Sequence, residues 1–162
     1  MNIAIYPGTF DPITYGHIDV IKKSLNVFDK VIVATTDNIN KNYHFPIEDR
    51  LSIINNSLFK DLRLSKSKIK VVSFDNLTID LCKKYKANTI IRGLRAVSDF
   101  EYEFQLAGMN KKLNSKIETM FLMSDVENQI ISSKFVREIV SLGGNVGRFV
   151  TRSTVKVLKN KI

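Results

Sequence analysis

The feature that most constrains the fold of this chain is a regular alternation between short apolar segments and segments with helical periodicity. The expected strands are rich in β-branched residues and lie at residues 2–6, Lys30–Thr35, Ile69–Phe74, Thr89–Ile91 and Ile117–Met123. The expected helices lie at Tyr15–Phe28, from Phe45–Glu48 onward, at Thr78–Tyr85, at Asp99–Leu113, from Ser132 or Ser133 to Leu142, and from near Thr154. Strands that alternate with helices pair in parallel through right-handed crossovers. We therefore expect an α/β fold with a doubly wound, mainly parallel sheet, in one domain that spans residues 1–162.

The pattern within these segments predicts which surfaces are buried. Lys30–Thr35 shows no polar alternation, as is typical of a parallel strand that helices cover on both faces. Gly143 and Gly144 are expected to end the helix that begins near Ser132. Two helices carry apolar residues at helical spacing, which predicts one buried face in each: Ile18, Ile21, Leu25 and Phe28 in the first, and Leu51, Ile54 and Leu58 in the second.

Charge and apolar content narrow the class of protein. The formal net charge is +9, which attracts anions, but the lysines are dispersed along the chain. A basic protein that binds RNA would instead need a contiguous Lys/Arg face with exposed aromatic residues, so RNA binding is only an alternative. No apolar run reaches the length of a membrane span, and the N-terminus lacks the basic segment of a signal peptide. The single cysteine, Cys82, cannot form an internal disulfide. We expect a cytoplasmic protein with small phosphorylated ligands and no nucleic-acid or membrane partner.

The ends of the expected strands are where the chemistry should be found. In doubly wound sheets, ligands bind beyond the carboxyl ends of the strands. The segments that follow the strands here are Tyr6–Thr9, Thr35–Asp37, Phe74–Asn76, Arg92–Arg95 and the residues from Ser124 onward.

The first of these segments leads into a motif, Gly8-Thr9-Phe10-Asp11-Pro12-Ile13-Thr14-Tyr15-Gly16-His17. Gly16 has no Cβ, which would let a nucleotide approach the backbone closely. The N-terminus of the following helix offers N–H groups and partial positive charge to a phosphate. His17 in the first turn can add a hydrogen bond to phosphoryl oxygens. The alternative is a capped helix with a surface histidine, which the glycine-rich segment upstream disfavours.

The second motif is Arg92-Gly93-Leu94-Arg95-Ala96-Val97-Ser98-Asp99-Phe100-Glu101-Tyr102-Glu103. Arginine side chains bind phosphate oxygens in a bidentate manner, and a glycine between them permits close approach of the backbone. Glu103 lies one helical turn beyond Asp99 and could accept hydrogen bonds from a ribose or a base. The alternative is a turn at a strand end with Arg–Glu pairs on the surface.

Three further features are weaker evidence for a functional role when each is taken alone. In Ile131-Ser132-Ser133-Lys134-Phe135-Val136-Arg137, the hydroxyl groups can cap a helix or bind phosphate. Lys41 lies in a polar loop, where a solvated lysine is the alternative. Thr78 begins an expected helix, where it could act as the N-cap.

Together these motifs resemble a known superfamily. Gly-x-Phe-Asp followed by Thr-x-Gly-His is similar to the signature of the nucleotidyltransferases that carry a (His/Thr)-x-Gly-His motif, and Ile131–Arg137 resembles their Ile-Ser-Ser/Thr-x-x-x-(Arg/Lys) motif. The run Arg-Gly-Leu-Arg-x-x-x-Asp-Phe-Glu-Tyr-Glu resembles the phosphopantetheine adenylyltransferase family. The resemblance covers residues 3 to about 158. It implies a Rossmann-like nucleotidyltransferase fold and an enzyme of coenzyme A biosynthesis that transfers AMP from ATP to 4'-phosphopantetheine, giving dephospho-coenzyme A and pyrophosphate.

The resemblance also implies roles for individual residues. His17 would stabilise the transition state, with Lys41 and Thr9 as further catalytic residues. The phosphopantetheine site would comprise Thr9, Lys41, Thr78 and Arg92. The ATP site would comprise Thr9, Phe10, His17, Gly93, Leu94, Arg95, Glu103, Asn128, Gln129, Ile130, Ile131, Ser132, Ser133 and Lys134. Mg²⁺ is expected with ATP, with no ligands from protein side chains, and the assembly is expected to be a homo-oligomer, a hexamer by resemblance.

The chain departs from the family pattern at two positions. The family commonly has an aromatic residue where Asn128 stands and a third serine where Lys134 stands. Both positions belong to the expected adenine and triphosphate contacts, so those contacts are the part of the site that the resemblance defines least. The remaining alternative within the superfamily is an enzyme for nicotinate mononucleotide or a phospho-alcohol, against which the segment from Arg92 to Glu103 argues.

Overall fold

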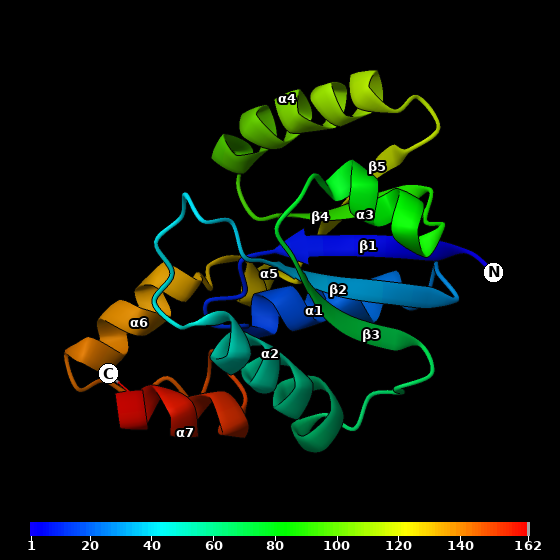
Figure 1. Cartoon of the computed structure of the whole chain (residues 1–162). Helices are drawn as coiled ribbons and strands as arrows, with labels where there is room; N and C mark the ends of the chain where they lie inside the picture. Colours follow the sequence, from blue (N-terminus) through cyan, green and yellow to red (C-terminus); the bar gives the residue numbers. More distant parts are fainter. Residues whose placement is uncertain (162) are drawn as a thin grey trace.

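The computed structural model describes residues 1–161, apart from the side chain of Ser98. Its strands are β1 (Ile3–Gly8), β2 (Lys30–Thr36), β3 (Ile69–Phe74), β4 (Thr89–Leu94) and β5 (Glu118–Met123). Its helices are α1 (Tyr15–Ser24), α2 (Ile47–Asn55), α3 (Thr78–Tyr85), α4 (Val97–Leu113), α5 (Val126–Gln129), α6 (Ser133–Ser141) and α7 (Arg152–Lys161). A π-helical turn at Asn56–Asp61 continues α2. Figure 1 shows these elements in one view.

The five strands form one sheet in the order β3-β2-β1-β4-β5, and every neighbouring pair is parallel. The central strand is β1, where Ile5 lies beside Ile32 of β2 and Ile90 of β4. The chain builds outward from β1 to β3 and then returns to the other side of β1. This reversal creates a switch point between β1 and β4, the place where such sheets bind ligands. The prediction of a doubly wound parallel sheet is confirmed.

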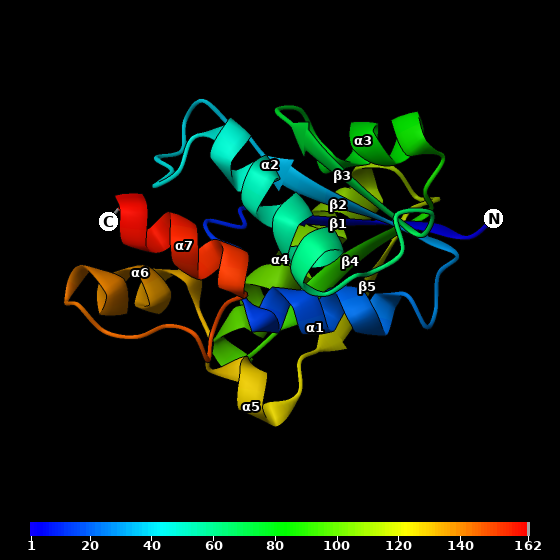
Figure 2. The same cartoon turned by 90° about the horizontal axis from the view of Figure 1, so that it is seen from below.

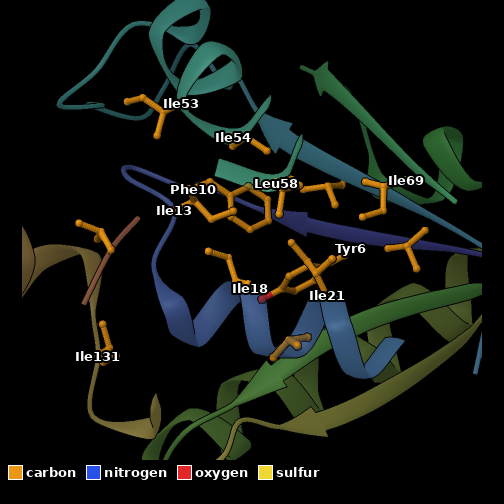
Figure 3. Close-up of a cluster of buried hydrophobic side chains, with 14 of the residues drawn as sticks. Tyr6, Phe10, Ile13, Ile18, Ile21, Ile53, Ile54, Leu58, Ile69 and Ile131 are labelled. Atoms are coloured by element: carbon orange, nitrogen blue, oxygen red, sulfur yellow. The ribbon is translucent and has the colours of Figure 1, made fainter. Parts of the chain in front are cut away.

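Helices cover both faces of the sheet. Figures 1 and 2 show α1, α2 and α7 on one face and α3 and α4 on the other. Side chains alternate along β1: Ala4 and Tyr6 belong to the larger core against α1 and α2, whereas Ile5 belongs to the smaller core against α3. Figure 3 shows part of the larger core, where Ile18 and Ile21 of α1 lie near Tyr6. The predicted two-sided burial is therefore confirmed.

Several predicted boundaries differ from the structure. The helix expected to reach Phe28 ends at Ser24, because the amides of Asn26 and Val27 donate to carbonyls three residues back and tighten the chain into turns. The strand expected to stop near Arg92 continues to Leu94. The short helix α5 was not predicted at all.

The buried face of α2 also differs from the prediction. Ile54 and Leu58 are fully buried as expected, but Leu51 is half-buried. Arg50 and Ile53 lie inside instead. The helix expected to open at Phe45–Glu48 begins at Ile47, with Pro46 at the N-cap position.

The C-terminal helix is held against the π-helical turn by buried hydroxyl groups. The Oγ atom of Ser57 lies 2.7 Å from Oγ1 of Thr151 and 3.1 Å from Oγ1 of Thr154. These contacts fix the start of α7 on the side of the molecule away from α3 and α4.

Two expectations from composition can be compared with the structure. Cys82 is buried in α3, where burial raises the pKa of its thiol to about 11. No helix within residues 1–161 combines the length and the apolar character needed to cross a membrane.

Candidate active site

The strand ends bring the sequence motifs to one edge of the sheet. Thr9 follows β1, the loop with Lys41 follows β2, Thr78 begins the helix after β3, and Arg92 lies in the second half of β4, before α4. Figure 1 shows that the loop between β2 and α2 lies at the same edge as α6. This is the edge at which the switch point of the sheet lies.

His17 is held in one tautomer at the corner between β1 and α1. The backbone N–H of Thr14 donates to Nδ1 of His17 at 3.1 Å, and Oγ1 of Thr14 lies 3.1 Å from the same atom. Because a backbone N–H can only donate, Nδ1 is the acceptor and the proton of the neutral ring lies on Nε2. Burial lowers the pKa of His17 to about 4, with a smaller contribution from the charge of Arg95. At neutral pH the ring is therefore an uncharged hydrogen-bond donor.

A tight turn before this corner leaves Thr9 exposed and buries Phe10. Phe10 has a φ of 47°, a left-handed conformation that is costly for a side chain of this size. Its ring packs edge-on against Tyr6 at 5.4 Å and against His17 at 5.1 Å between centroids. Gly8 makes room for it, since a Cβ there would lie 2.8 Å from the ring. Any contact of Phe10 with a ligand must therefore come from its backbone.

Gly16 is required for a reason that the sequence did not suggest. A Cβ at this position would lie 3.1 Å from the carbonyl oxygen of Asn128 and 3.6 Å from that of Ile131. The hydroxyl of Ser124 donates to the carbonyl of Gly16 at 3.1 Å. The space beside Gly16 is thus filled by the backbone around α5, where the sequence interpretation had placed a nucleotide.

The loop that carries Lys41 is anchored to the motif after β1. The buried carboxylate of Asp11 accepts hydrogen bonds from the backbone N–H groups of His44 at 2.7 Å and Phe45 at 3.0 Å. Lys41 itself is exposed. Within the described part of the chain, its Nζ atom forms no ion pair.

Arg50 is a residue of this edge that the sequence reasoning missed. Its side chain is 0% exposed, and its guanidinium hydrogen-bonds to groups on the ends of β1 and β2 and on the Lys41 loop. The available signal was its position three and four residues before Ile53 and Ile54, which places it on the buried face of α2.

The corner between β4 and α4 is dominated by an ion pair. Nε and Nη2 of Arg92 donate to the two carboxylate oxygens of Glu103 at 2.7 and 2.6 Å, and Nη1 donates to the carbonyl of Pro7 at 3.0 Å. Burial by itself would lower the pKa of Arg92, but the hydrogen bonds and charge of Glu103 raise it overall. Glu103 is 8% exposed. Two residues that the sequence assigned to different ligands therefore bind each other.

The rest of the corner between β4 and α4 is more exposed to solvent than the pair of Arg92 and Glu103. Arg95 is exposed, and its Nε donates to Asp99 at 3.2 Å. Gly93 is packed against protein, since a Cβ there would lie 3.3 Å from Val20 and 3.5 Å from the hydroxyl of Tyr6. The close approach that this glycine permits is therefore with α1 and β1.

The start of α6 faces the corner between β1 and α1. Ser132 accepts a hydrogen bond from the N–H of Phe135 at 3.1 Å, which confirms the predicted N-cap. Ser133 donates to the carbonyl of Pro12 at 2.7 Å, and Arg137 donates to the carbonyl of Asp11. Lys134 is exposed in the first turn of the helix.

An apolar groove lies beside this helix start. Polar groups contribute little to its lining, which includes Ile130, Ile131, Phe135, Ile139 and Phe149. Asn128 and Gln129 of α5, which precede it, are half-buried. Thr78 is half-buried at the first residue of α3, but the cap position is Leu77, so the interpretation of Thr78 as an N-cap is wrong.

Among residues 1–161, no three His, Cys, Asp or Glu side chains come together in a way that would hold a metal ion.

This fold and site define a class of nucleotide-transferring proteins. A family model described as Cytidylyltransferase-like matches residues 5–139. Two solved structures share the fold. The first is a putative nicotinate-nucleotide adenylyltransferase from Vibrio parahaemolyticus, with a TM-score of 0.70 and 21% identity, and the match covers 98% of this chain and 99% of that one. The second is a Plasmodium falciparum nicotinic acid mononucleotide adenylyltransferase, with a TM-score of 0.71 and 19% identity, and the match covers 98% of this chain and 95% of that one.

Full-length relatives narrow the class further. A phosphopantetheine adenylyltransferase of Pelagibacter ubique is 67% identical over 99% of this chain and 98% of its own length. Proteins of the same name from Legionella pneumophila and Roseobacter denitrificans are 48% and 43% identical, over 98% and 100% of this chain and 90% and 98% of their own lengths. The chain belongs to the phosphopantetheine adenylyltransferase family, a branch of the cytidylyltransferase-like proteins.

Proposed function

We propose that this protein transfers AMP from ATP to 4'-phosphopantetheine, forming dephospho-coenzyme A and releasing pyrophosphate. The observation that carries the proposal is full-length membership of the family, with 67% identity to a phosphopantetheine adenylyltransferase. The site geometry supports it, because a neutral histidine donor, an exposed lysine and a helix start lie at the switch point of one sheet. We also propose a cytoplasmic location for the enzyme, as expected from the sequence.

The chemistry requires no nucleophile from the protein. The phosphate of the acceptor attacks the α-phosphorus of ATP in line, and the bond to the pyrophosphate group breaks. Catalysis then depends on positioning and on stabilising charge at the α-phosphate. We assign Thr9 and the Nε2–H of His17 to the α-phosphate, and Lys41 to both reacting phosphates, where its charge reduces their repulsion. A neutral histidine suits this role, because it donates a hydrogen bond while Nδ1 remains fixed by Thr14.

Arg92 keeps donors for the acceptor phosphate even while it is paired. A guanidinium has five N–H groups. Glu103 and Pro7 accept hydrogen bonds from three of its nitrogens, which leaves one N–H on each of Nη1 and Nη2 for a ligand. We therefore assign Arg92 to phosphopantetheine, together with Thr78. Glu103 orients Arg92 in this arrangement, and its assigned contact with ATP uses lone pairs that Arg92 does not occupy.

The ATP site combines both sides of the β1–α1 corner. The apolar groove beside α6 suits the flat face of a base, and the N-terminus of α6 suits the triphosphate. We assign to ATP the backbone of Phe10, Gly93–Arg95, and the segment from Asn128 to Lys134. Lys134 in this chain adds a cation that the triphosphate can bind.

Mg²⁺ fits this site as a partner of the nucleotide. Mg²⁺ commonly keeps several waters and binds phosphate oxygens, so the triphosphate itself can hold the ion. Bound in this way, the ion would neutralise charge on the triphosphate.

We further propose that the protein is a homo-oligomer, a hexamer as the family resemblance suggests. The surface of α4 supports association, because the helix exposes six large apolar side chains, which are distributed around it: Val97, Phe100, Tyr102, Phe104, Met109 and Leu113. Isolated exposed apolar residues are common, but such a set on one helix is typical of an interface between proteins.

The proposal is tested by pyrophosphate release from ATP with a panel of acceptors. We expect release with 4'-phosphopantetheine and none above background with pantetheine, which lacks the attacking phosphate. Nicotinate mononucleotide and glycerol phosphate represent the other branches of the superfamily. Faster release with either of these than with phosphopantetheine would overturn the assignment.

A further inference from the structure

We propose that Arg50 is a positioning residue for adenylyl transfer, which fixes the backbone of Thr9 and the loop with Lys41 relative to each other. The proposal rests on the proposed function, since Thr9 and Lys41 matter here as groups that contact the reacting phosphates. Arg50 itself is remote from solvent and ligand, because its side chain is 0% exposed.

The first support is the number of separate segments that Arg50 joins. Nη1 donates to the carbonyl of Thr9 at 3.1 Å, to Oγ1 of Thr35 at 3.0 Å and to the carbonyl of Thr36 at 2.7 Å. These acceptors belong to the turn after β1 and to the end of β2. One nitrogen therefore holds together the two strand ends that flank the site.

The second support is that Arg50 holds both ends of the Lys41 loop. Its Nη2 donates to the carboxylate of Asp37 at 3.2 Å, where the loop begins, and its Nε donates to the carbonyl of Phe45 at 3.0 Å, where the loop ends. Its guanidinium carbon lies 3.8 Å from the ring centroid of Tyr43, in a cation–π contact inside the loop. Lys41 lies between these attachments.

The third support is the cost of placing a cation at this position. A buried charge is unfavourable unless it is paired and hydrogen-bonded. An apolar residue on the same face of α2 would avoid this cost, as Ile53 and Ile54 do. No neutral side chain, however, presents five donors in one plane to acceptors on three segments. The arrangement is therefore explained by the geometry it imposes on the loops.

The first experiment measures kcat and KM per folded molecule for Arg50→Met and Arg50→Lys, with the folded fraction taken from thermal unfolding. We expect Arg50→Met to lower kcat roughly 10²-fold, as small misplacements of reacting groups do, and to change KM for ATP far less. Arg50→Lys keeps the charge and should recover part of the rate. A kcat of Arg50→Met within about threefold of wild type would overturn the proposal.

The control separates positioning from general destabilisation. Ser57→Ala removes a buried hydroxyl from the cluster with Thr151 and Thr154, which lies outside the proposed site. We expect it to lower the melting temperature while kcat stays unchanged. If Ser57→Ala lowers kcat as much as Arg50→Met, the loss reflects global stability and the positioning role is excluded.

A double-mutant cycle tests the connection to Lys41. If Arg50 acts through the loop, the loss caused by Arg50→Met should be smaller in the Lys41→Ala background than in wild type. Additive losses would contradict the proposal.

Hydrogen exchange provides a readout that does not depend on activity. In Arg50→Lys, a variant that keeps the charge and so the fold, we expect faster exchange at residues 37–45 and at the turn after β1, with β5 unchanged. Unchanged exchange in the loop would overturn the role of Arg50 even if the enzyme is active. Failure of the wild-type protein to transfer AMP to phosphopantetheine would instead overturn the proposed function.

Discussion

The two corners that flank the switch point of the sheet are built in contrasting ways. Between β1 and α1, the polar groups find their partners within the chain: Thr14 fixes His17, Asp11 holds the Lys41 loop, and Arg50 holds the strand ends. Between β4 and α4, the arrangement is open apart from the pair of Arg92 and Glu103. The polar groups of the first corner are paired within the chain, whereas the second corner leaves Arg95 and the apolar side chains of α4 exposed.

The helices that follow the corners differ in the same way. α1 buries Ile18, Val20 and Ile21 completely. In α4, by contrast, Phe104 and Met109 are each 63% exposed. The difference suggests that rigidity at the first corner serves the reacting phosphates, while the second corner serves recognition and assembly. The predictions below test this division, in order of decreasing effect.

His17→Ala should cause the largest loss, because it removes a donor from the rigid corner. We expect kcat to fall about 10²–10³-fold, with a much smaller change in the dissociation constant of ATP, since the contact strengthens in the transition state. His44→Ala, at an exposed histidine, is the matched control in steady-state kinetics. A rate within about threefold of wild type would remove His17 from catalysis and weaken the contrast between the corners.

The pKa of His17 tests whether the corner between β1 and α1 is closed to water. A pKa lowered from 6.5 to about 4 corresponds to a roughly 300-fold loss of proton affinity. Between those two pH values the unfolded chain binds more protons, so this group makes the fold more stable as pH rises from 4 to 6.5. NMR titration of His17 in the His44→Ala variant should show a neutral ring down to about pH 5. Protonation near pH 6.5 would mean that the corner is open to water.

Arg92→Ala tests the recognition role of the second corner. We expect KM for phosphopantetheine to rise roughly 10- to 100-fold, the effect of losing a charge-assisted hydrogen bond, with a smaller change for ATP. The substitution also leaves the carboxylate of Glu103 buried without its partner. Arg92→Ala combined with Glu103→Gln removes that charge and should retain the KM defect. Equal rises for both substrates in the double variant would show that Arg92 is assigned to the wrong ligand.

Phe104→Glu tests assembly through α4. Loss of an aromatic hot-spot contact costs about 2 kcal/mol or more, so with Phe104 in that role we expect dissociation of the oligomer to become at least about 30-fold easier. Light scattering across a dilution series measures this, and Val27→Glu, at a half-exposed apolar residue distant from α4, is the control. A wild-type protein that is monomeric at micromolar concentration would refute assembly itself.

Lys134→Ser should have the smallest effect, since the residue is exposed. A cation in the first turn of a helix opposes the helix dipole, and a triphosphate at that turn would offset this cost. We expect KM for ATP to rise roughly three- to tenfold at low ionic strength, less at high salt, with KM for phosphopantetheine unchanged. Lys84→Ser on α3 controls for the loss of charge. An unaltered KM for ATP at low salt would mark Lys134 as a solvated lysine.

Local pattern was sufficient to predict most of the fold. β2 can be recognised because a buried parallel strand is an uninterrupted apolar run. The cap at Ser132 can be recognised because its hydroxyl group has a local partner. The early end of α1 at Ser24 was missed, since Phe28 remains buried and continues the apolar spacing beyond the helix.

The site was predicted less completely, because its contacts join distant segments. The residue types assigned to phosphates are recognisable from their positions after strands. The pairing of Arg92 with Glu103 was foreseen only as an alternative on the surface, and the contact of Arg50 with Thr9 across 41 positions depends on how the sheet is assembled. Sequence spacing alone does not contain that information.

The packing at Gly16 has a consequence for how this sequence can change over time. Even a methyl group there would meet the carbonyl oxygen of Asn128 at 3.1 Å, so an alanine requires the backbone around α5 to give way. At Gly108 on α4, by contrast, a methyl group would meet no atom within 4 Å among the described residues. The two glycines therefore differ in how easily another residue can replace them. A side chain at Gly108 meets no obstacle in the described part of the subunit, whereas a side chain at Gly16 requires a shift in a segment that lies more than a hundred residues later in the chain.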